Sequence, residues 1–293
     1  MKNIISEGKI GIFDSGLGGL VIAKAIFSAK GSPRIRESEA GGPASGGKNL
    51  SSYDYVYLGD TKWLPYGNKS AGQVYKYTSR AIKYLFDQDC QLVILACNTA
   101  SALALRKIQQ EYLPKFYPGK RVLGVVIPTL EEADKNHKRK IIGVIGTSAT
   151  IRSHIYKKEL IKIDAKAKIF EVAAPKLVPL IERNSLQLAE KTLGLYLQPL
   201  LKHNIEALIL GCTHYPILEQ QIKKLVGKNI KVVSQTDFLP GKLSNYLKRH
   251  PEISKKLSKH HQRTFLVTKY NREFGEVAKR LFGRKLKFEV VPF

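Results

Sequence analysis

The sequence contains little cysteine: Cys90, Cys97 and Cys212 are the only three among 293 residues. An odd and low number of cysteines argues against a disulfide framework, and none of the three has the Cys-x-x-Cys or Cys/His spacing of a zinc site. We therefore expect reduced thiols, each either a small buried side chain or a reactive group. No metal ion and no cofactor is expected.

Long hydrophobic runs are also missing. No apolar stretch approaches the roughly 18–20 residues that span a bilayer. The first residues lack the long apolar segment and the small-residue cleavage site of a secretory leader. We expect a cytoplasmic protein without a membrane partner.

Acidic residues are scarce, with 24 Asp and Glu against 49 Lys and Arg, for a net charge of +25. Such an excess favours acidic partners, from nucleic acid to small carboxylates. The basic residues are scattered, although denser at 135–140 and 242–263, and no aromatic residues interleave with them as in a nucleic-acid motif. We interpret them as a solvated surface. A basic nucleic-acid-binding protein stays open as an alternative that we do not expect.

Short apolar runs rich in β-branched residues alternate with amphipathic stretches along the chain. This pattern predicts a parallel α/β sheet covered by helices on both faces. The expected strands are 10–13, 55–58, 92–96, 122–127, 141–146, 169–173, 207–211, 230–234 and 264–268. The expected helices include 71–87, 100–112, 151–162, 187–203 and 216–226.

A weak internal repeat relates two parts of the sequence. The segment 10–19 resembles 143–152, with a strand, a small polar turn and a helix. The segment 92–101 resembles 208–216 more closely, because each has an apolar strand, a small residue, a cysteine and then polar residues that open a helix. Two similar α/β halves predict a site shared between them.

We expect the first α/β domain to contain residues 1–120 and 228–293, and the second to contain residues 121–227. The segment 29–52 is dominated by Gly, Ser, Pro and Ala. This composition predicts a flexible insertion after the first helix.

Polar side chains follow four of the predicted strands directly: Asp14, Cys97, Thr147 and Cys212. In open parallel sheets, ligands bind outside the carboxyl ends of the strands. We therefore expect these four side chains to converge on one crevice. Cys90 precedes its strand, and we interpret it as a structural residue.

Each of Cys97 and Cys212 stands where a strand gives way to an expected helix. The free N–H groups and positive dipole of a helix N-terminus favour a thiolate and bind carboxylates. The side chains of Asn98, Thr99 and Thr213 would add hydrogen bonds to such an anion.

Three further groups could assist the thiols: Asp14, His214 and Glu182. Taken singly, a helix cap, a hydrogen-bonded histidine and a solvated glutamate would explain them as well. Together with two thiols they fit the inversion of an α-carbon. One thiolate removes the proton from one face and a thiol returns a proton to the other, by general acid–base catalysis.

The motifs resemble those of the glutamate racemases in the aspartate/glutamate racemase superfamily. The matching segments, in the family's order, are FDSGLGG (13–19), YLGDTKWLPYGNKS (57–70), ACNTAS (96–101), PKLVPLIE (175–182) and GCTHYP (211–216). The resemblance implies two pseudo-symmetric domains, each a mostly parallel sheet flanked by helices, with the active site in the cleft between them. It also implies cofactor-independent interconversion of L- and D-glutamate, the D-isomer serving peptidoglycan synthesis. We expect a homodimer with glutamate as its small-molecule substrate.

The resemblance also assigns roles to residues. Cys212 takes the proton from L-glutamate and Cys97 from D-glutamate, with Asp14 helping Cys97 and both Glu182 and His214 helping Cys212. Substrate-binding positions are Asp14, Ser15, Tyr66, Gly67, Asn98, Thr99, Thr213 and His214, with Thr147 as a further candidate.

The chain departs from the family pattern at a few places. The insertion at 29–52 is long, 124–133 replaces an acidic-Pro-Gly run, 232–238 lacks an acidic-Ser-Gly turn, and Ala174 stands where cysteine is common. None of these removes a catalytic position. Racemisation of aspartate or another acidic or hydantoin-type substrate remains the alternative.

Overall fold

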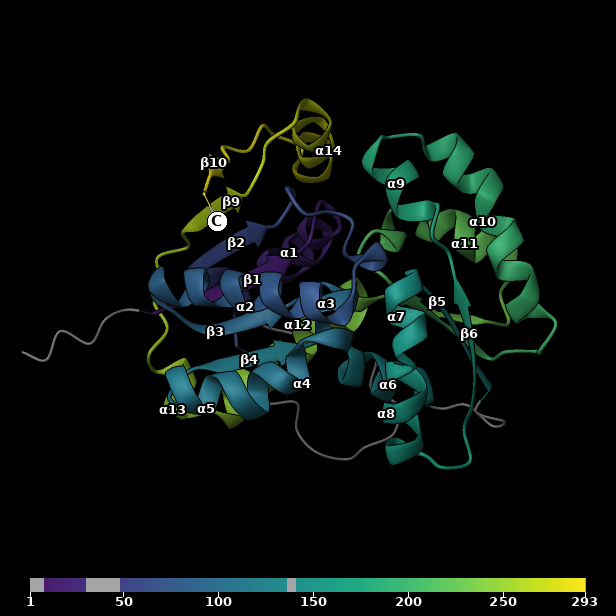
Figure 1. Cartoon of the computed structure of the whole chain (residues 1–293), viewed down its shortest axis with the longest axis horizontal. Helices are drawn as coiled ribbons and strands as arrows, with labels where there is room; N and C mark the ends of the chain where they lie inside the picture. Colours follow the sequence, from purple (N-terminus) through teal and green to yellow (C-terminus); the bar gives the residue numbers. More distant parts are fainter. Residues whose placement is uncertain (1–7, 30–47, 136–140, 293) are drawn as a thin grey trace, which may run out of the picture.

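A computed structural model describes residues 8–29, 48–135 and 141–292. Two parallel sheets lie side by side, each flanked by helices (Figure 1). The predicted α/β class is confirmed. None of the described helices has the length and apolar character to cross a membrane.

The larger sheet has six strands in the order β10-β9-β2-β1-β3-β4, and the smaller has four in the order β6-β5-β7-β8. The first sheet consists of β1 (Lys9–Asp14), β2 (Tyr55–Gly59), β3 (Cys90–Leu95), β4 (Arg121–Gly124), β9 (Arg263–Val267) and β10 (Glu289–Val290). The second consists of β5 (Ile141–Gly146), β6 (Lys168–Ala173), β7 (Ala207–Gly211) and β8 (Lys231–Val233). The yellow C-terminal strand β9 lies in the same sheet as the purple β1, so both ends of the described chain build the first sheet (Figure 1).

The helices connect these strands and cover both faces of each sheet. Those of the first half are α1 (Gly18–Ser28), α2 (Ala71–Asp87), α3 (Asn98–Leu103), α4 (Leu105–Lys107), α5 (Leu113–Phe116), α12 (Gln235–Arg249), α13 (Pro251–Ser254) and α14 (Arg272–Phe282). Those around the second sheet are α6 (Val126–Asp134), α7 (Ser148–Ser153), α8 (Ile155–Ile163), α9 (Leu177–Glu182), α10 (Leu186–Leu201) and α11 (Glu219–Val226).

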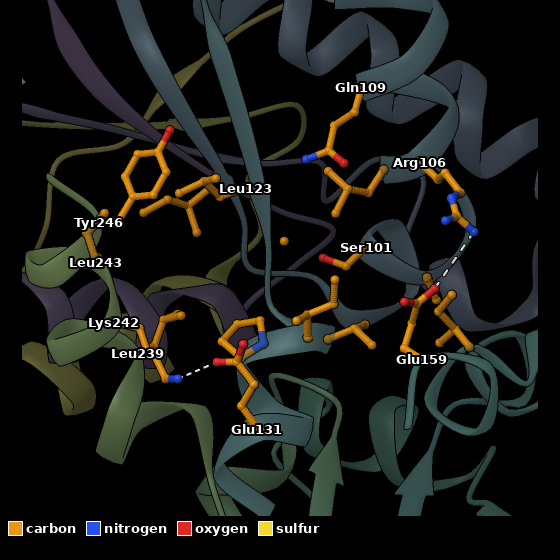
Figure 2. Close-up of a pocket in the computed structure, with 18 of the residues that line it drawn as sticks. Ser101, Arg106, Gln109, Leu123, Glu131, Glu159, Leu239, Lys242, Leu243 and Tyr246 are labelled. Atoms are coloured by element: carbon orange, nitrogen blue, oxygen red, sulfur yellow. Dashed lines mark hydrogen bonds and ion pairs between the residues drawn. The ribbon is translucent and has the colours of Figure 1, made fainter. Parts of the chain in front are cut away.

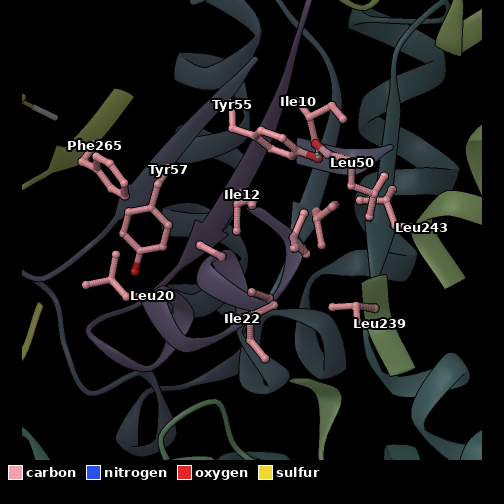
Figure 3. Close-up of a cluster of buried hydrophobic side chains, with 14 of the residues drawn as sticks. Ile10, Ile12, Leu20, Ile22, Leu50, Tyr55, Tyr57, Leu239, Leu243 and Phe265 are labelled. Atoms are coloured by element: carbon pink, nitrogen blue, oxygen red, sulfur yellow. Dashed lines mark hydrogen bonds between the residues drawn. The ribbon is translucent and has the colours of Figure 1, made fainter. Parts of the chain in front are cut away.

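Side chains along each strand alternate between two cores, because successive residues of a strand point to opposite faces. Along β1, Ile10 and Ile12 join one core while Phe13 joins the other. Figure 3 shows the first core, where Ile10 and Ile12 of β1 lie near Leu239 and Leu243 of α12. Because both faces are buried, the strands are almost continuously apolar.

Helix α2 shows how local sequence sets the boundary of a predicted helix. The hydroxyl oxygen of its N-cap residue, Ser70, accepts a hydrogen bond from the backbone N–H of Gln73, and Oε1 of Gln73 accepts one from the backbone N–H of Ser70. This capping box satisfies two free donors of the first turn. The helix spans residues 71–87, as expected, and packs its apolar face on the sheet.

Two short strands, β4 and β8, lie in a different sheet from the one that the expected domain boundaries predict for them. Strand β4 pairs with β3 of the first sheet, and β8 pairs with β7 of the second. Each is an edge strand whose apolar side chains extend the neighbouring core, Val122 in the first half and Val233 in the second. The division of the chain at residues 121 and 227 is therefore wrong by one strand at each crossing, while the existence of two domains stays a prediction.

Several predicted helices are interrupted. The stretch 100–112 contains α3, α4 and a π-helical turn, and 151–162 is broken at His154, which has a φ of 52°. The predicted strand 122–127 ends at Gly124, before α6 begins at Val126.

Residues 30–47 of the expected flexible insertion lie outside the described residues. Its last part is ordered against the core, since Leu50 is buried beneath α1. The expectation of a flexible segment is wrong for that part.

Candidate active site

The ends of β1, β3, β5 and β7 open onto a small cavity between the two sheets. The cavity has a volume of about 20 Å³, which is room for roughly one water molecule. Its wall includes both Cys97 and Cys212. The lining residues are Ser15, Leu64, Pro65, Tyr66, Gly67, Cys97, Asn98, Thr99, Thr147, Val178, Cys212, Thr213 and His214. The structure therefore brings the two thiols together with most of the predicted substrate-binding residues.

Cys97 is the N-cap residue of α3. Its sulfur accepts a hydrogen bond from the backbone N–H of Ala100 at 3.4 Å and lies 3.5 Å from the hydroxyl oxygen of Ser15. Burial, with the negative charge of Asp14 nearby, raises the pKa of the Cys97 thiol to about 12. The helix terminus predicted at this cysteine is present, but burial outweighs it and favours the neutral thiol.

Asp14 is fully buried at the end of β1 and does not line the cavity. One carboxylate oxygen accepts hydrogen bonds from the backbone N–H groups of Gly16 and Gly19, at 2.9 and 3.0 Å. The other accepts a bond from the Thr213 hydroxyl at 3.1 Å. Burial raises the pKa of Asp14 to about 6, against the opposing effects of His214 and these hydrogen bonds. Asp14 therefore links the first sheet to the loop that follows Cys212.

Cys212 faces a different set of groups. Its sulfur lies 3.6 Å from Nδ1 of His214, and Nε2 of His214 is hydrogen bonded to Glu182. Glu182 also accepts a hydrogen bond from the backbone N–H of Leu17 at 3.0 Å. Burial lowers the pKa of His214, but the contacts with Cys212 and Glu182 prevail and raise it well above its ordinary value. These residues form a chain of polar contacts behind Cys212.

The helix N-terminus expected directly after Cys212 is absent. The described chain continues through Thr213 and His214 into a 3₁₀ turn, and α11 begins only at Glu219. Because the turn contains Pro216 and is too short to align many peptide dipoles, His214 rather than a helix is the positive group beside this thiol.

Three threonine hydroxyls join the two halves of the site. Oγ1 of Thr99 lies 3.0 Å from that of Thr147 and 3.1 Å from that of Thr150, and the last two are 2.9 Å apart. Thr147 is the N-cap of α7, and Thr150 follows three residues later on the same face. The sequence interpretation missed Thr150, although the spacing of three after a cap residue could have indicated it.

Tyr66 and Gly67 form part of the cavity wall, where Gly67 lies against Thr147. The Tyr66 hydroxyl donates to Asp60 at 2.6 Å and Asp60 accepts a second bond from Thr268 at 2.8 Å. A Cβ atom at Gly67 would lie 2.5 Å from Cβ of Thr147. Glycine is therefore required here so that the two halves approach closely.

Asn98 is held by two residues that the sequence interpretation did not single out. Oδ1 of Asn98 accepts hydrogen bonds from the Tyr156 hydroxyl at 2.6 Å and from Nε2 of Gln235 at 3.1 Å. These partners are 58 and 137 residues away in sequence. No local signal could have identified them.

Cys90, as expected, is separate from this site. It is the first residue of β3 and lies in the core beneath α2. Among the described residues, no group of three or more His, Cys, Asp or Glu side chains is arranged to hold a metal ion.

A second and larger pocket, of about 460 Å³, is lined by residues of α3, α4, α6 and α12 (Figure 2). Ser101 and Leu123 line it from the first half, and Lys242 of α12 pairs there with Glu131 of α6. Arg106 and Glu159 approach each other at 3.9 Å across its rim. Neither catalytic thiol candidate contributes to its wall. The smaller cavity is therefore the candidate active site.

Comparisons with known proteins show the family to which the chain belongs. The profile of the Asp/Glu/Hydantoin racemase family matches residues 65–239. A glutamate racemase from Aquifex pyrophilus is 39% identical over 243 residues, covering 82% of this chain and 84% of that protein. One from Dinoroseobacter shibae is 33% identical over 298 residues, covering 96% and 98%.

Solved structures give the same result. A glutamate racemase isoform from Bacillus anthracis has a TM-score of 0.82 and 29% identity, with 98% of both chains covered. A glutamate racemase from Francisella tularensis in complex with D-glutamate has a TM-score of 0.79 and 29% identity, again with 98% of both chains covered.

The fold and the paired thiols define an amino-acid racemase, and the chain belongs to the Asp/Glu/Hydantoin racemase family. Within that family, it is a member of the glutamate racemases. The resemblance inferred from the sequence motifs is confirmed.

Proposed function

We propose that the chain interconverts L- and D-glutamate without a cofactor, using Cys97 and Cys212 as an acid/base pair on opposite faces of the α-carbon. The observation that carries this proposal is the presence of both sulfurs in the wall of one small cavity. Each thiol arises from a strand end in a different half of the molecule. Such an arrangement allows a substrate to be approached from two sides without turning over.

The reaction from L-glutamate begins with the Cys212 thiolate. Its sulfur takes the proton from Cα, and the electron pair of the C–H bond moves toward the α-carboxylate. The Cys97 thiol then donates its proton to the other face of Cα, which forms D-glutamate and leaves Cys97 as the thiolate. The two thiols have exchanged protonation states. Cys212 then releases a proton to solvent and Cys97 takes one from solvent, which restores the starting state.

The surroundings of the two sulfurs support this starting state. The imidazolium of His214, whose pKa is raised by its contacts with Cys212 and Glu182 despite burial, stabilises negative charge on Cys212. Burial and the charge of Asp14 keep Cys97 protonated, with its pKa at about 12. A base and an acid are thus paired before substrate arrives.

Hydrogen-bond donors in the cavity wall would hold the substrate carboxylates. The Ser15 hydroxyl and the N–H₂ group of Asn98 are candidates, whereas the Thr213 hydroxyl donates to Asp14 and the Thr99 and Thr147 hydroxyls bond one another until substrate enters. Donors at the α-carboxylate also stabilise the charge that develops on it as Cα loses its proton.

A racemisation assay tests the proposal. Purified protein, without pyridoxal phosphate or added metal, is expected to convert either glutamate enantiomer into the racemate. Circular dichroism measures the conversion. Aspartate is expected to react far more slowly. Absence of glutamate turnover, or equal turnover of aspartate, would contradict the assigned substrate.

The cellular setting is inferred from the resemblance. We expect a homodimer in the cytoplasm whose D-glutamate supplies peptidoglycan synthesis. Light scattering of the purified protein tests the dimer. We expect no nucleic-acid partner, and a salt-sensitive shift of duplex DNA would contradict that expectation.

A further inference from the structure

The side-chain amide of Asn98 lies in the cavity wall with one end unpaired. Asn98 is 1% exposed. Its Nδ2 is buried and has no hydrogen-bond partner among the residues that the structure describes. A buried N–H₂ group without a partner is unfavourable, because it has lost its hydrogen bonds to water and gained none in return. An anionic substrate in the cavity would supply the missing acceptor.

The other end of the same amide is fully engaged. Oδ1 accepts from the Tyr156 hydroxyl and from Nε2 of Gln235. If the amide were rotated by 180°, Nδ2 would face the N–H₂ group of Gln235, and two donors would oppose each other. The orientation of Asn98 thus depends on the orientation of Gln235.

Gln235 is itself oriented by the backbone. Its Nε2 also donates to the carbonyl oxygen of Leu210 in β7 at 3.0 Å. Rotating the Gln235 amide would place an oxygen against that carbonyl, which is unfavourable because both are acceptors. The Leu210 carbonyl thereby fixes the orientation of the Gln235 amide, and the Gln235 amide fixes that of Asn98. The N–H₂ group of Asn98 must therefore point away from Tyr156 and Gln235.

We propose that Gln235 and Tyr156 are positioning residues for substrate binding, which hold the Asn98 amide so that Nδ2 donates to a carboxylate of bound glutamate. This proposal rests on the proposed function. It adds two residues that neither contact the cavity nor belong to the segments by which the family was recognised. Gln235 lies within 232–238, where the chain departs from the family pattern.

The three residues come from different parts of the fold. Asn98 begins α3 beside the first sheet, Tyr156 lies in α8 beside the second, and Gln235 begins α12, which leaves β8 and returns to the first core. All three are at most 1% exposed. The donor into the cavity therefore forms correctly only when the two halves are docked.

Two near-isosteric substitutions, Tyr156→Phe and Gln235→Met, test the proposal. Each removes one donor to Oδ1 of Asn98 while retaining the apolar bulk. We expect each to raise KM for glutamate about five- to tenfold, with kcat changed less than about threefold, because loss of one neutral hydrogen bond weakens ground-state binding.

Matched controls remove similar groups far from the cavity. Tyr55→Phe deletes a buried hydroxyl that donates to the Leu50 carbonyl, and Gln109→Met deletes an amide that donates to the Val122 carbonyl. Both controls are expected to retain the wild-type KM.

A double-mutant cycle separates positioning from a general structural role. In an Asn98→Ala background, Tyr156→Phe and Gln235→Met should change KM by less than about twofold, because their target is gone. The proposal is overturned if both single variants keep the wild-type KM, or if their effects persist undiminished in that background. Tyr156→Phe, the milder change, decides the outcome if Gln235→Met does not fold. A wild-type protein that fails to racemise glutamate would instead reject the proposed function.

Discussion

The two candidate thiols occupy comparable positions at strand ends but have contrasting surroundings. Cys97 contacts a neutral hydroxyl and a backbone N–H, with a carboxylate close by. Cys212 contacts an imidazole that is hydrogen bonded to Glu182. Burial and the nearby carboxylate raise the pKa of Cys97, whereas the sulfur of Cys212 lies beside an imidazole whose own pKa is raised by its contacts. The comparison teaches that a near-symmetric fold can place two identical side chains beside groups of opposite charge.

This difference between the two thiols is visible in only some kinetic measurements. Racemisation has an equilibrium constant of one, so kcat/KM must be equal in the two directions, whichever thiol is impaired. Differences between the halves therefore appear in isotope effects rather than in kcat/KM. Deuterium at Cα of one enantiomer slows the step in which the thiol on that face removes the proton.

The largest expected effect comes from removing either thiol. Cys97→Ser and Cys212→Ser should each lower kcat/KM by about 10²–10⁴-fold, because a serine hydroxyl is too weak an acid or base for the transfer. Steady-state racemisation of both enantiomers is the measurement. Cys90→Ala, in the core beneath α2, is the matched control and should stay active. Near-wild-type activity in either serine variant would exclude that thiol as essential.

The polar groups beside the thiols should have unequal effects. His214→Gln should lower kcat/KM by about 10–100-fold, because it removes a charged partner, whereas Ser15→Ala should lower it only about fivefold. His214→Gln is expected to enlarge the isotope effect with L-glutamate, and Ser15→Ala that with D-glutamate. Equal isotope effects in both variants would show that the halves are not specialised.

Asp14→Asn should change the pH dependence of stability. The native pKa of about 6, against an ordinary value of 3.8, means that the folded state binds the proton more tightly. Stability is therefore lost as pH rises from about 4 through 6, by roughly 3 kcal/mol for this group. The variant lacks this pH-dependent loss, so its free energy of unfolding should rise relative to that of the wild type between pH 4 and 7. We expect the variant to racemise glutamate more slowly.

Urea unfolding at a series of pH values measures this gain. Asp87→Asn, at the exposed end of α2, is the control, and the pH dependence of its free energy of unfolding should be closer to that of the wild type. A constant difference between Asp14→Asn and the wild type across this pH range would mean that Asp14 is not held at a raised pKa.

The smallest expected effect concerns the close approach of the two halves. A Cβ atom at Gly18 would lie 2.4 Å from Oγ1 of Thr213 and 2.7 Å from the backbone nitrogen of His214. Gly18→Ala should therefore destabilise the protein by about 1–3 kcal/mol and weaken activity.

Gly194→Ala on α10 is the control, since no described atom lies within 4 Å of its added Cβ. That change should stabilise the helix by about 0.5–1 kcal/mol. Thermal unfolding of both variants distinguishes them. Equal stability would mean that the contact at Gly18 is readily relaxed.

Much of the site followed from the sequence, because strand ends in a parallel sheet meet at one edge. Cys97, Thr147 and Cys212 were predicted to converge on this basis, and all three line the cavity. Asp14 also follows a strand end, but it does not line the cavity and instead accepts a hydrogen bond from Thr213, which does. The apolar runs also located the main strands, because buried strands need few polar residues.

The remaining features depend on contacts distant in sequence. Gln235 reaches Asn98 across 137 residues, and Glu182 reaches the backbone of Leu17 across 165. The edge strands β4 and β8 were assigned to the wrong sheets because pairing partners are set by tertiary packing. Periodicity describes which face of an element is buried but not what it packs against.

The most direct test of the two-thiol account is the fate of the Cα hydrogen in heavy water. Starting from unlabelled L-glutamate, the first few per cent of D-glutamate should carry deuterium at Cα, while the remaining L-glutamate stays almost unlabelled. Separate thiols on the two faces predict this result. Deuterium appearing at equal rates in both enantiomers would show that one base serves both faces, and would contradict the account.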